Sequence, residues 1–339
     1  MRIGLLTGGG DCPGLNGVIR AAVLRAVRGY GDECVGFLDG WRGPLERTFV
    51  PLGVDDVTDI LADGGTILGT SRTNAGTPQR VAAIKAALAE LGVDALIPIG
   101  GEDTLGAAAR LSAAGVRCVG VPKTIDNDLS GTDVTFGFTT AVQIAVDAVD
   151  RLKTTSASHH RAIVVEVMGR HAGWIALHVG VATGATATLV PEVPFDIDQV
   201  AARAKAEVDR RRWAVVVVAE GAVPASVASG GDAQVVDEFG HVAVGGIAAY
   251  LADELARRAG VETRPIVIGH VQRGGVPTAF DRVLTTRLGV AAVDALHRGE
   301  DGVMVAARGD QIATVSLAEA TGTLRTVPPE LFEALTSIV

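Results

Sequence analysis

Lysine is scarce in this sequence, where four lysines stand against twenty-six arginines. The sequence contains no long basic run, and its formal net charge is −9 with a pI near 5.3. A chain without a long cluster of cations is not suited to neutralise a phosphate backbone, so nucleic acid and an anionic membrane are not expected as partners. An anionic substrate must therefore bind to locally arranged cations.

Long apolar runs and paired cysteines are also absent. No apolar stretch reaches the roughly eighteen residues of a membrane helix, and the opening MRIGLLTGG has a strand pattern without a targeting leader. Cys12, Cys34 and Cys118 are an odd number without metal-ligand spacing, which favours packing roles in a reducing compartment. We therefore expect a cytoplasmic protein.

Apolar, β-branched runs recur along the chain with helical patterns between them. Hydrophobic residues make up 48% of the 339 residues, enough for a large core. Strands without alternation of apolar and polar residues, separated by helix-length segments, indicate a parallel sheet covered on both faces, so the class is doubly wound α/β. The predicted strands are RIGLL, CVGFL, ALIPIG, VRCVGV, AIVVEVMG, WAVVVVAEG, PIVIGHV and VMVAA.

The number of these strands exceeds what one compact sheet of this size needs. Together with a helical stretch from Phe138 to Thr154, they predict two Rossmann-like lobes with mainly parallel sheets and an active-site cleft between them. We place the first lobe at residues 1–137 plus about 270–320, and the second at 138–269. Residues 222–244 have turn composition and are expected to form a surface excursion.

The stretch IPIGGEDTLGAA combines a phosphate-binding pattern with two acids. A predicted strand ends at Gly100-Gly101 and a helical pattern follows, which is how a helix N-terminus binds an anion. Glu102 and Asp103 would repel a phosphate. Either this turn binds no phosphate, or a metal neutralises the charge, or one acid excludes a ligand.

Two further glycine-rich stretches have the same ambiguity. In LLTGGGDCPGLN, three glycines follow a strand and precede a helix that begins near Asn16, so the backbone of Gly8–Gly10 could approach an anion or form a plain turn. In residues 64–78, Arg72 could bind a phosphate bidentately or could simply be solvated.

The stretch PKTIDNDLSGTD places polar groups at the carboxyl end of a strand, where open α/β sheets bind ligands. Asp126 and Asp128 are two residues apart, so an extended backbone would point both carboxylates to one side, and one could accept a proton from a hydroxyl. Lys123, Thr124 and Asn127 accompany them. The alternative interpretation is an Asx-rich turn without chemistry.

Arginines gather beside glycines in the second half. A protein of net negative charge that places several cations at strand ends is expected to bind a phosphorylated small molecule there. Individually, each of these cations could serve in a structural salt bridge. The residues are Arg161, Arg170, Arg264, His270 and Arg273.

Five motifs stand in the order and spacing of the phosphofructokinase family: TGGGDCPGLN, GGEDT, PKTIDND, MGRHAGW and GHVQRGG. The sequence resembles that family from residue 1 to about residue 310, and most closely its pyrophosphate-dependent members in the bacterial mixed-substrate subgroup. The resemblance implies a transferase of glycolysis that phosphorylates the 1-hydroxyl of fructose 6-phosphate, with Mg²⁺ as cofactor. It also implies a homodimer or homotetramer.

The resemblance gives each matching residue an expected role. Asp126 is the general base, with Thr124 and Asp128 beside it. Arg170 stabilises the phosphoryl group in transfer. On the donor side, Gly9 and Arg72 contact the donor phosphate and Glu102 binds the metal. The sugar-phosphate pocket is expected to contain Thr124, Ile125, Asp126, Met168, Gly169, Arg170, Glu220, His270, Val271, Gln272 and Arg273, with Arg161 and Arg264 contributed by a neighbouring subunit.

Two departures from the ATP-using members point to the donor. Those members carry Gly-Gly-Asp-Gly where this chain has Glu102 and Asp103, and the Asp103 carboxylate would occupy the place and mimic the charge of an α-phosphate. Lys123 replaces a usual glycine and would pair with pyrophosphate. Asp103 weighs more, because lysine also occurs there in some ATP-dependent relatives and a buried, unpaired carboxylate tolerates a polyphosphate poorly. Pyrophosphate is the predicted donor, and the reaction should be reversible.

Three alternatives stay open. An ATP-dependent phosphofructokinase would keep every catalytic residue and change only the donor. A lipid or NAD kinase shares a GGDGT-like loop but needs neither TIDND nor the arginine set. A non-catalytic sugar-phosphate sensor would need the arginines but not Asp126, and it would bind fructose 6-phosphate without turnover.

Overall fold

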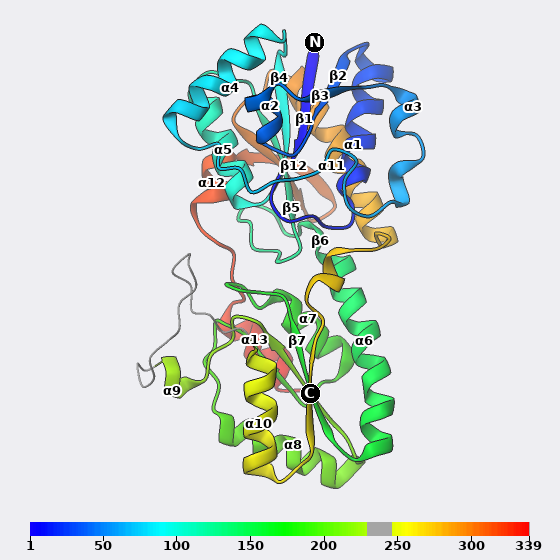
Figure 1. Ribbon diagram of the computed structural model, residues 1–339, viewed down its shortest axis with the longest axis vertical. Helices are drawn as coiled ribbons and strands as arrows, with labels where there is room; N and C mark the ends of the chain where they lie inside the picture. Colours follow the sequence, from blue (N-terminus) through cyan, green and yellow to red (C-terminus); the bar gives the residue numbers. More distant parts are fainter. Residues whose placement is uncertain (229–245, 339) are drawn as a thin grey trace. The chain divides into compact units, whose positions relative to one another are not determined.

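The chain forms two compact units, and the computed structural model describes residues 1–228 and 246–338 (Figure 1). Unit 1 contains Met1–Thr140 and Arg273–Leu324, and unit 2 contains Ala141–Gln272 and Arg325–Val339. Residues 325–339 therefore return to unit 2. Most of the excursion predicted at 222–244 lies outside the described residues.

Unit 1 is built on an eight-stranded sheet. Its neighbouring strands are parallel except at the two edges, where β12 runs antiparallel to β11 and β3 antiparallel to β2. A short strand, β6 (Phe136–Gly137), pairs with β5 beside the main path. In sheet order, the path is β12 (Gln311–Ser316), β11 (Val303–Arg308), β5 (Val119–Thr124), β4 (Ala95–Gly100), β1 (Arg2–Thr7), β2 (Glu33–Phe37) and β3 (Phe49–Leu52).

The helices of unit 1 cover both faces of this sheet. The neighbouring helices α1 (Leu15–Leu24) and α11 (Ala279–His297) pack together, and α5 (Glu102–Ala113) packs against α12 (Leu317–Gly322) (Figure 1). The helix α4 (Pro78–Glu90) is capped by the Thr77 side chain, which accepts the Arg80 N–H. The shorter helices are η1 (Arg25–Tyr30), α2 (Arg42–Glu46), α3 (Val54–Val57) and η2 (Ile60–Ala62).

Unit 2 has a parallel four-stranded sheet in the order β10 (Thr263–Val267), β7 (Ala162–Val167), β9 (Ala214–Ala219) and β8 (Ala187–Leu189). The long helix α6 (Phe138–His159) begins in unit 1 and continues into unit 2. The other helices are α7 (Trp174–Thr183), α8 (Ile197–Arg211), α9 (Ala225–Ala228), α10 (Ile247–Ala259), η3 (Gly269–Arg273) and α13 (Pro329–Thr336), for which Pro329 lies in the first turn.

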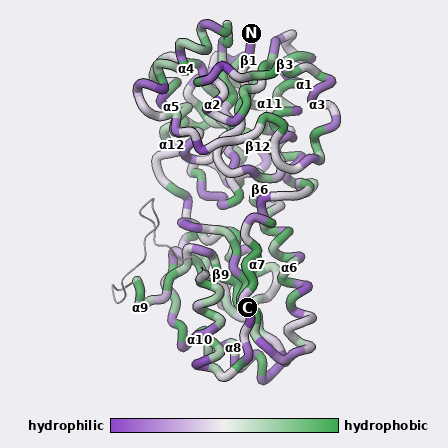
Figure 2. The backbone as a smooth tube through the Cα atoms, in the orientation of Figure 1, coloured by the Kyte–Doolittle hydropathy of each residue, from purple (hydrophilic) through white to green (hydrophobic). Residues whose placement is uncertain are grey.

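The central strands are buried throughout, as expected for sheets covered on both faces. All six residues of β4, β7 and β9 are buried. Figure 2 shows polar and apolar residues side by side along α8 and α10, which present one face to the sheet of unit 2. No helix in the described part of the chain is long and apolar enough to cross a membrane.

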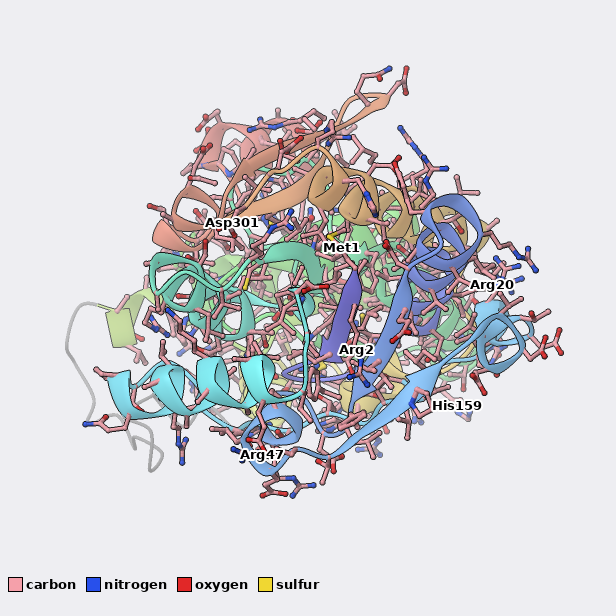
Figure 3. All side chains as sticks on the ribbon, turned by 90° about the horizontal axis from the view of Figure 1, so that it is seen from above. Met1, Arg2, Arg20, Arg47, His159 and Asp301 are labelled. Atoms are coloured by element: carbon pink, nitrogen blue, oxygen red, sulfur yellow. The ribbon has the colours of Figure 1, made fainter. Side chains whose placement is uncertain are left out.

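The amino ends of the unit 1 strands, viewed in Figure 3 with Met1 near the centre, are closed by structural contacts. The Asp301 carboxylate accepts the Cys118 N–H at 2.8 Å before β5 begins and the Ser112 hydroxyl at 3.0 Å. The carboxyl ends of β1, β4 and β5 carry the predicted motifs.

The predicted mixed α/β class with mainly parallel sheets is confirmed, and every predicted strand corresponds to an observed one. Four strands escaped prediction. The edge strands β3 and β12 are partly exposed, β6 has two residues and β8 has three. Such short or half-exposed segments lack the buried apolar run on which the prediction depended.

Candidate functional site

The glycine turn after β1 is held close to the turn after β4. The Gly8 N–H donates to the Ile99 carbonyl at 2.9 Å, and Gly9 has the left-handed φ of 78° that glycine tolerates. A side chain at Gly10 would collide with Arg273, because its Cβ would lie 2.1 Å from Nη1. The Arg273 guanidinium therefore covers this turn and donates to the Asp11 carbonyl at 3.4 Å.

The loop of residues 64–77 is hydrogen bonded to the same glycine turn. The Thr70 hydroxyl donates to the Gly9 carbonyl at 2.5 Å, and the Gly9 N–H makes a long contact of 3.4 Å with the Ser71 carbonyl. The Thr7 hydroxyl donates to the Gly69 carbonyl at 2.7 Å. These contacts place Arg72, which is exposed, next in sequence to a residue that touches Gly9.

Lys123 lies beneath the glycine turn instead of facing solvent. The residue is only 4% exposed, and its ammonium donates to the Gly10 carbonyl. A Cβ on Gly9 would be 3.3 Å from Nζ. Burial lowers the pKa of Lys123, and the Arg273 charge lowers it further. The structure therefore gives Lys123 a second role, in holding the turn from below.

The acidic pair stands in the first turn of α5. Glu102 and Asp103 are both exposed. Behind them, Thr104 is buried and fills the space that a Cβ on Gly8 or Gly100 would need, with closest approaches of 2.4 and 2.3 Å. The expectation of a buried carboxylate at Asp103 is thus wrong. Its charge is nevertheless presented at the same edge as the glycine turn.

The segment after β5 turns sharply where an extended strand was expected. Asn127 has a φ of 54°, so Asp126 and Asp128 do not lie on one side of an extended backbone. The Thr124 hydroxyl accepts the Asp126 N–H at 3.1 Å, and Asn127 Oδ1 accepts the Thr135 N–H at 2.9 Å. Asn127 has the structural role of an Asx-rich turn, whereas both aspartates are half-buried at its rim.

This turn rests on β6, which a buried carboxylate supports. Asp281, fully buried in α11, accepts the Gly137 N–H at 3.1 Å, the Thr140 N–H at 2.9 Å and the Thr140 hydroxyl at 2.5 Å. Gly137 pairs in turn with Thr124. Asp281 therefore fixes both the start of α6 and the strand beside the Asp126 turn.

In unit 2, the MGRHAGW motif forms a loop at the carboxyl end of β7. Gly169 has a φ of 136°, and its carbonyl accepts the Gly221 N–H at 3.1 Å from the end of β9. The Met168 N–H donates to the buried Gln272 side chain at 2.9 Å. Arg170 is exposed at the tip of this loop. Glu220, next to Gly221, donates its N–H to the Val167 carbonyl.

Arg161 and Arg264 share one carboxylate in unit 2. Glu262 Oε1 lies 3.3 Å from Arg161 Nη2 and 2.7 Å from Arg264 Nη2. The Arg264 side chain is 59% exposed, so this ion pair is weak in energetic terms but keeps two cations together. His270 and Val271 of η3 are exposed in the same unit.

The predicted residues therefore fall into two sets. Unit 1 brings the donor-side residues together, and it also contains Arg273, which had been expected among the sugar-binding residues near His270. Unit 2 contains the Met168–Arg170 loop and the arginine pair. Ile125, which was expected in the sugar-phosphate pocket, is only 2% exposed.

The sequence analysis missed three residues whose contacts hold candidate site residues in place: Thr104, Glu262 and Asp281. The sequence held a signal only for Asp281, because Thr278 and Asp281 have the spacing of a helix N-cap and its third residue, and the Thr278 hydroxyl accepts the Asp281 N–H. Thr104 and Glu262 act through contacts across the fold, and local sequence does not encode those contacts.

Few of the described side chains are placed to bind a metal ion. Among the described residues, no group of three or more histidine, cysteine, aspartate or glutamate side chains is arranged to hold a metal ion. An exposed carboxylate such as Glu102 nevertheless fits Mg²⁺, which usually keeps several waters and binds through one or two carboxylates together with substrate phosphates.

The chain is similar in sequence and in structure to known proteins. The sequence profile of the family described as phosphofructokinase matches residues 2–296. The crystal structure of Pichia pastoris phosphofructokinase in the T-state is 32% identical, with a TM-score of 0.84, and the match covers 95% of this chain and 35% of that longer one.

Curated relatives divide over the phosphoryl donor. A protein of Amycolatopsis methanolica named pyrophosphate–fructose 6-phosphate 1-phosphotransferase is 59% identical over 98% of both chains. A protein of Streptomyces coelicolor named ATP-dependent 6-phosphofructokinase 3 is 56% identical over 97% of both chains. Overall identity therefore does not separate the two donors, and the residues around the donor must do so.

Proposed function

Because the chain belongs to the phosphofructokinase family, we propose that it transfers a phosphoryl group from inorganic pyrophosphate to the 1-hydroxyl of fructose 6-phosphate. The products are fructose 1,6-bisphosphate and phosphate. The observation that carries the choice of donor is the exposed Asp103 carboxylate in the first turn of α5. Because pyrophosphate and the product ester have similar driving force for phosphoryl transfer, the reaction runs in both directions.

The donor preference follows from charge and space at this helix end. Members that use ATP have a glycine at the position of Asp103, which leaves room for the α-phosphate. A carboxylate there meets a longer polyphosphate with like charge, and pyrophosphate is short enough to avoid it. Lys123 adds a cation beneath the glycine turn, and Arg72 adds another beside it. Both support a donor that has no nucleoside contacts.

The proton of the reacting hydroxyl goes to Asp126. The Thr124 hydroxyl fixes the backbone of Asp126, and the turn at Asn127 leaves the Asp126 carboxyl group at the rim. A carboxylate held in this way can accept the proton while the hydroxyl oxygen attacks phosphorus. Asp128 shares the rim and keeps the local field negative, which favours proton acceptance.

The sugar phosphate is assigned to unit 2. The exposed side chains suited to a phosphate are Arg170 and His270 of this unit, together with Arg264, which we assign to the site of a neighbouring subunit. Arg170 is the residue proposed to stabilise the phosphoryl group in transfer, because charge spreads over three equatorial oxygens in that state. The loop that carries it is held by backbone hydrogen bonds to the end of β9, so its position is defined before substrate binds.

Glu102 is proposed to hold Mg²⁺ together with oxygens of pyrophosphate. The ion would supply positive charge that offsets the phosphates and the acidic pair of α5. This resolves the conflict between a phosphate-binding turn and two acids: one acid binds the cation, and the other selects the donor.

We also propose a homo-oligomer. β10 is an edge strand whose last four residues are exposed, and Ile266 and Val267 present apolar side chains there. An exposed apolar edge is a site for association, and Arg264 lies on it.

Sedimentation should give a dimer or tetramer, and Arg264→Ala should weaken fructose 6-phosphate binding about tenfold. A fully active monomer would contradict this assignment.

A reducing compartment, the cytoplasm, fits the cysteines. All three are free and buried. Burial raises the pKa of Cys12 and Cys34 to about 12, so neither thiol is reactive at neutral pH.

ATP is the alternative donor, because relatives named for ATP are nearly as similar as those named for pyrophosphate. It would leave the roles of Asp126 and Arg170 unchanged. The alternative requires the Asp103 side chain to turn away from the donor, which its exposed position permits sterically but which gains nothing electrostatically.

Turnover distinguishes the proposed enzyme from a sugar-phosphate sensor. Fructose 6-phosphate, pyrophosphate and Mg²⁺ are incubated with the protein, and ³¹P NMR follows the appearance of a 1-phosphate ester and free phosphate. Starting from fructose 1,6-bisphosphate and phosphate, the same mixture should form in reverse. Saturable binding of fructose 6-phosphate without any ester would refute the proposal in favour of a sensor.

A further inference from the structure

The segment Arg325–Val327, which we call the strap, crosses the base of the Arg170 loop in unit 2. Neither the motifs nor the family resemblance gave this part of the chain a role. Val327 is 1% exposed, and Trp174, against which the strap lies, is 5% exposed. Val327 therefore anchors the strap in the interior of unit 2, whereas Arg325 is half-buried and Thr326 is exposed.

Three contacts attach the strap to the end of the Arg170 loop. The Trp174 indole N–H donates to the Arg325 carbonyl at 2.9 Å, and the Arg325 guanidinium lies 4.3 Å from the centre of the Trp174 ring. The third contact runs through Glu192, whose Oε1 accepts the Val327 N–H at 2.8 Å. Both oxygens of the same carboxylate accept the Gly173 N–H, at 2.9 and 3.1 Å.

The Arg170 loop has little freedom to move independently of the strap. Gly173, where the strap contacts begin, is three residues from Arg170. A Cβ on Gly173 would lie 2.4 Å from the Val190 Cβ, and a Cβ on Gly221 would lie 1.9 Å from the Arg170 carbonyl. Because this backbone is closely packed on both sides, a shift at Gly173 or Trp174 must be transmitted along the loop to Arg170.

The residues just before the strap are attached in unit 1. Leu324 forms an antiparallel bridge with Leu129, and the Ser130 hydroxyl donates to the Thr323 carbonyl at 2.6 Å. Leu129 directly follows Asp128 in the turn that bears Asp126. One short run of chain thus contacts the turn of the proposed base in unit 1 and the loop of Arg170 in unit 2.

We propose that the strap is a positioning element for Arg170, acting through Trp174 and Glu192. The inference rests on the proposed function, because it takes Arg170 as the cation that meets the transferred phosphoryl group. A positioned guanidinium lowers the barrier only when its geometry is correct before the reaction, so loosening the strap should lower kcat more than it raises KM.

A double-mutant cycle tests this proposal. Trp174→Phe keeps the aromatic ring and removes the N–H donated to Arg325, and it should lower kcat about tenfold. In an Arg170→Ala background the same substitution should change the residual kcat less than twofold, because the group being positioned is gone. Equal factors in the two backgrounds would overturn the proposal and leave the strap a purely structural role.

The controls separate folding, strap and function. Trp213→Phe removes the other indole of unit 2 that stacks on an arginine, Arg211 at 4.0 Å, and should leave kcat unchanged. Arg325→Met removes the stacked guanidinium but keeps the carbonyl acceptor, and it provides a second test should Trp174→Phe not fold. The cycle is run with whichever donor the wild type uses. A wild type that turns over neither pyrophosphate nor ATP refutes the proposed function, whereas an active wild type with equal factors refutes only the strap.

Discussion

Asp126→Ser is expected to reduce kcat for fructose 1,6-bisphosphate formation by a factor on the order of 10³, because it removes the proposed base that accepts the hydroxyl proton. The hydrogen bond from the Asp126 backbone N–H to the Thr124 hydroxyl is retained, so the turn should keep its shape. Steady-state kinetics with both substrates measure kcat, and equilibrium binding of fructose 6-phosphate should change less than threefold, since the phosphate-binding arginines are untouched.

Asp133→Ser is the matched control for the loss of an aspartate from the same segment. Its carboxylate is exposed and accepts the Gly309 N–H at 2.7 Å. We expect nearly wild-type kcat for this variant. If Asp126→Ser kept more than a tenth of the wild-type kcat, the base would have to be another group in the turn, and Asp128 would be the first to test.

Asp103→Gly should shift the donor preference. The ratio of kcat/KM for pyrophosphate to that for ATP is expected to fall by about 100-fold, because the substitution removes a charge near the donor and opens space for an α-phosphate. Initial rates over a range of each donor, at fixed fructose 6-phosphate and Mg²⁺, give the ratio. An unchanged ratio would show that Asp103 does not select the donor.

Two companion variants separate the physical causes of the donor preference. Asp103→Asn keeps the volume and removes the charge, so a shift similar to that of the glycine variant would assign the selection to electrostatics. Lys123→Met tests the other marker and should weaken pyrophosphate use through the loss of a cation. Because Lys123 also holds the glycine turn through Gly10, this variant should additionally lower stability.

The fold could be predicted because its strands are buried on both faces. The continuous apolar runs of β4, β7 and β9 are typical of strands buried on both faces, and the helix-length segments between such runs indicated parallel sheets. The unit boundaries of the structure, after Thr140 and Gln272, depend on contacts instead of composition. The return of residues 325–338 to unit 2 could not be read from their sequence for the same reason.

The motifs predicted candidate site residues but not their local geometry. The expected side-by-side aspartates assumed an extended backbone, and the left-handed Asn127 was not foreseen, although asparagine is among the residues that adopt this conformation. Lys123 was expected to pair with pyrophosphate, and its burial under the glycine turn was not foreseen. Asp281 and Glu192 accept hydrogen bonds from backbone groups far away in sequence, and only the folded chain reveals these contacts.

The selection of pyrophosphate by a carboxylate at the start of α5 is tested most directly by comparing the two donors with the wild-type protein. Fructose 1,6-bisphosphate formation is measured from fructose 6-phosphate and Mg²⁺, with pyrophosphate in one reaction and ATP in the other. We predict turnover with pyrophosphate and little or none with ATP. Turnover with ATP alone would contradict the role given to Asp103, while leaving the fold and the role of Asp126 intact.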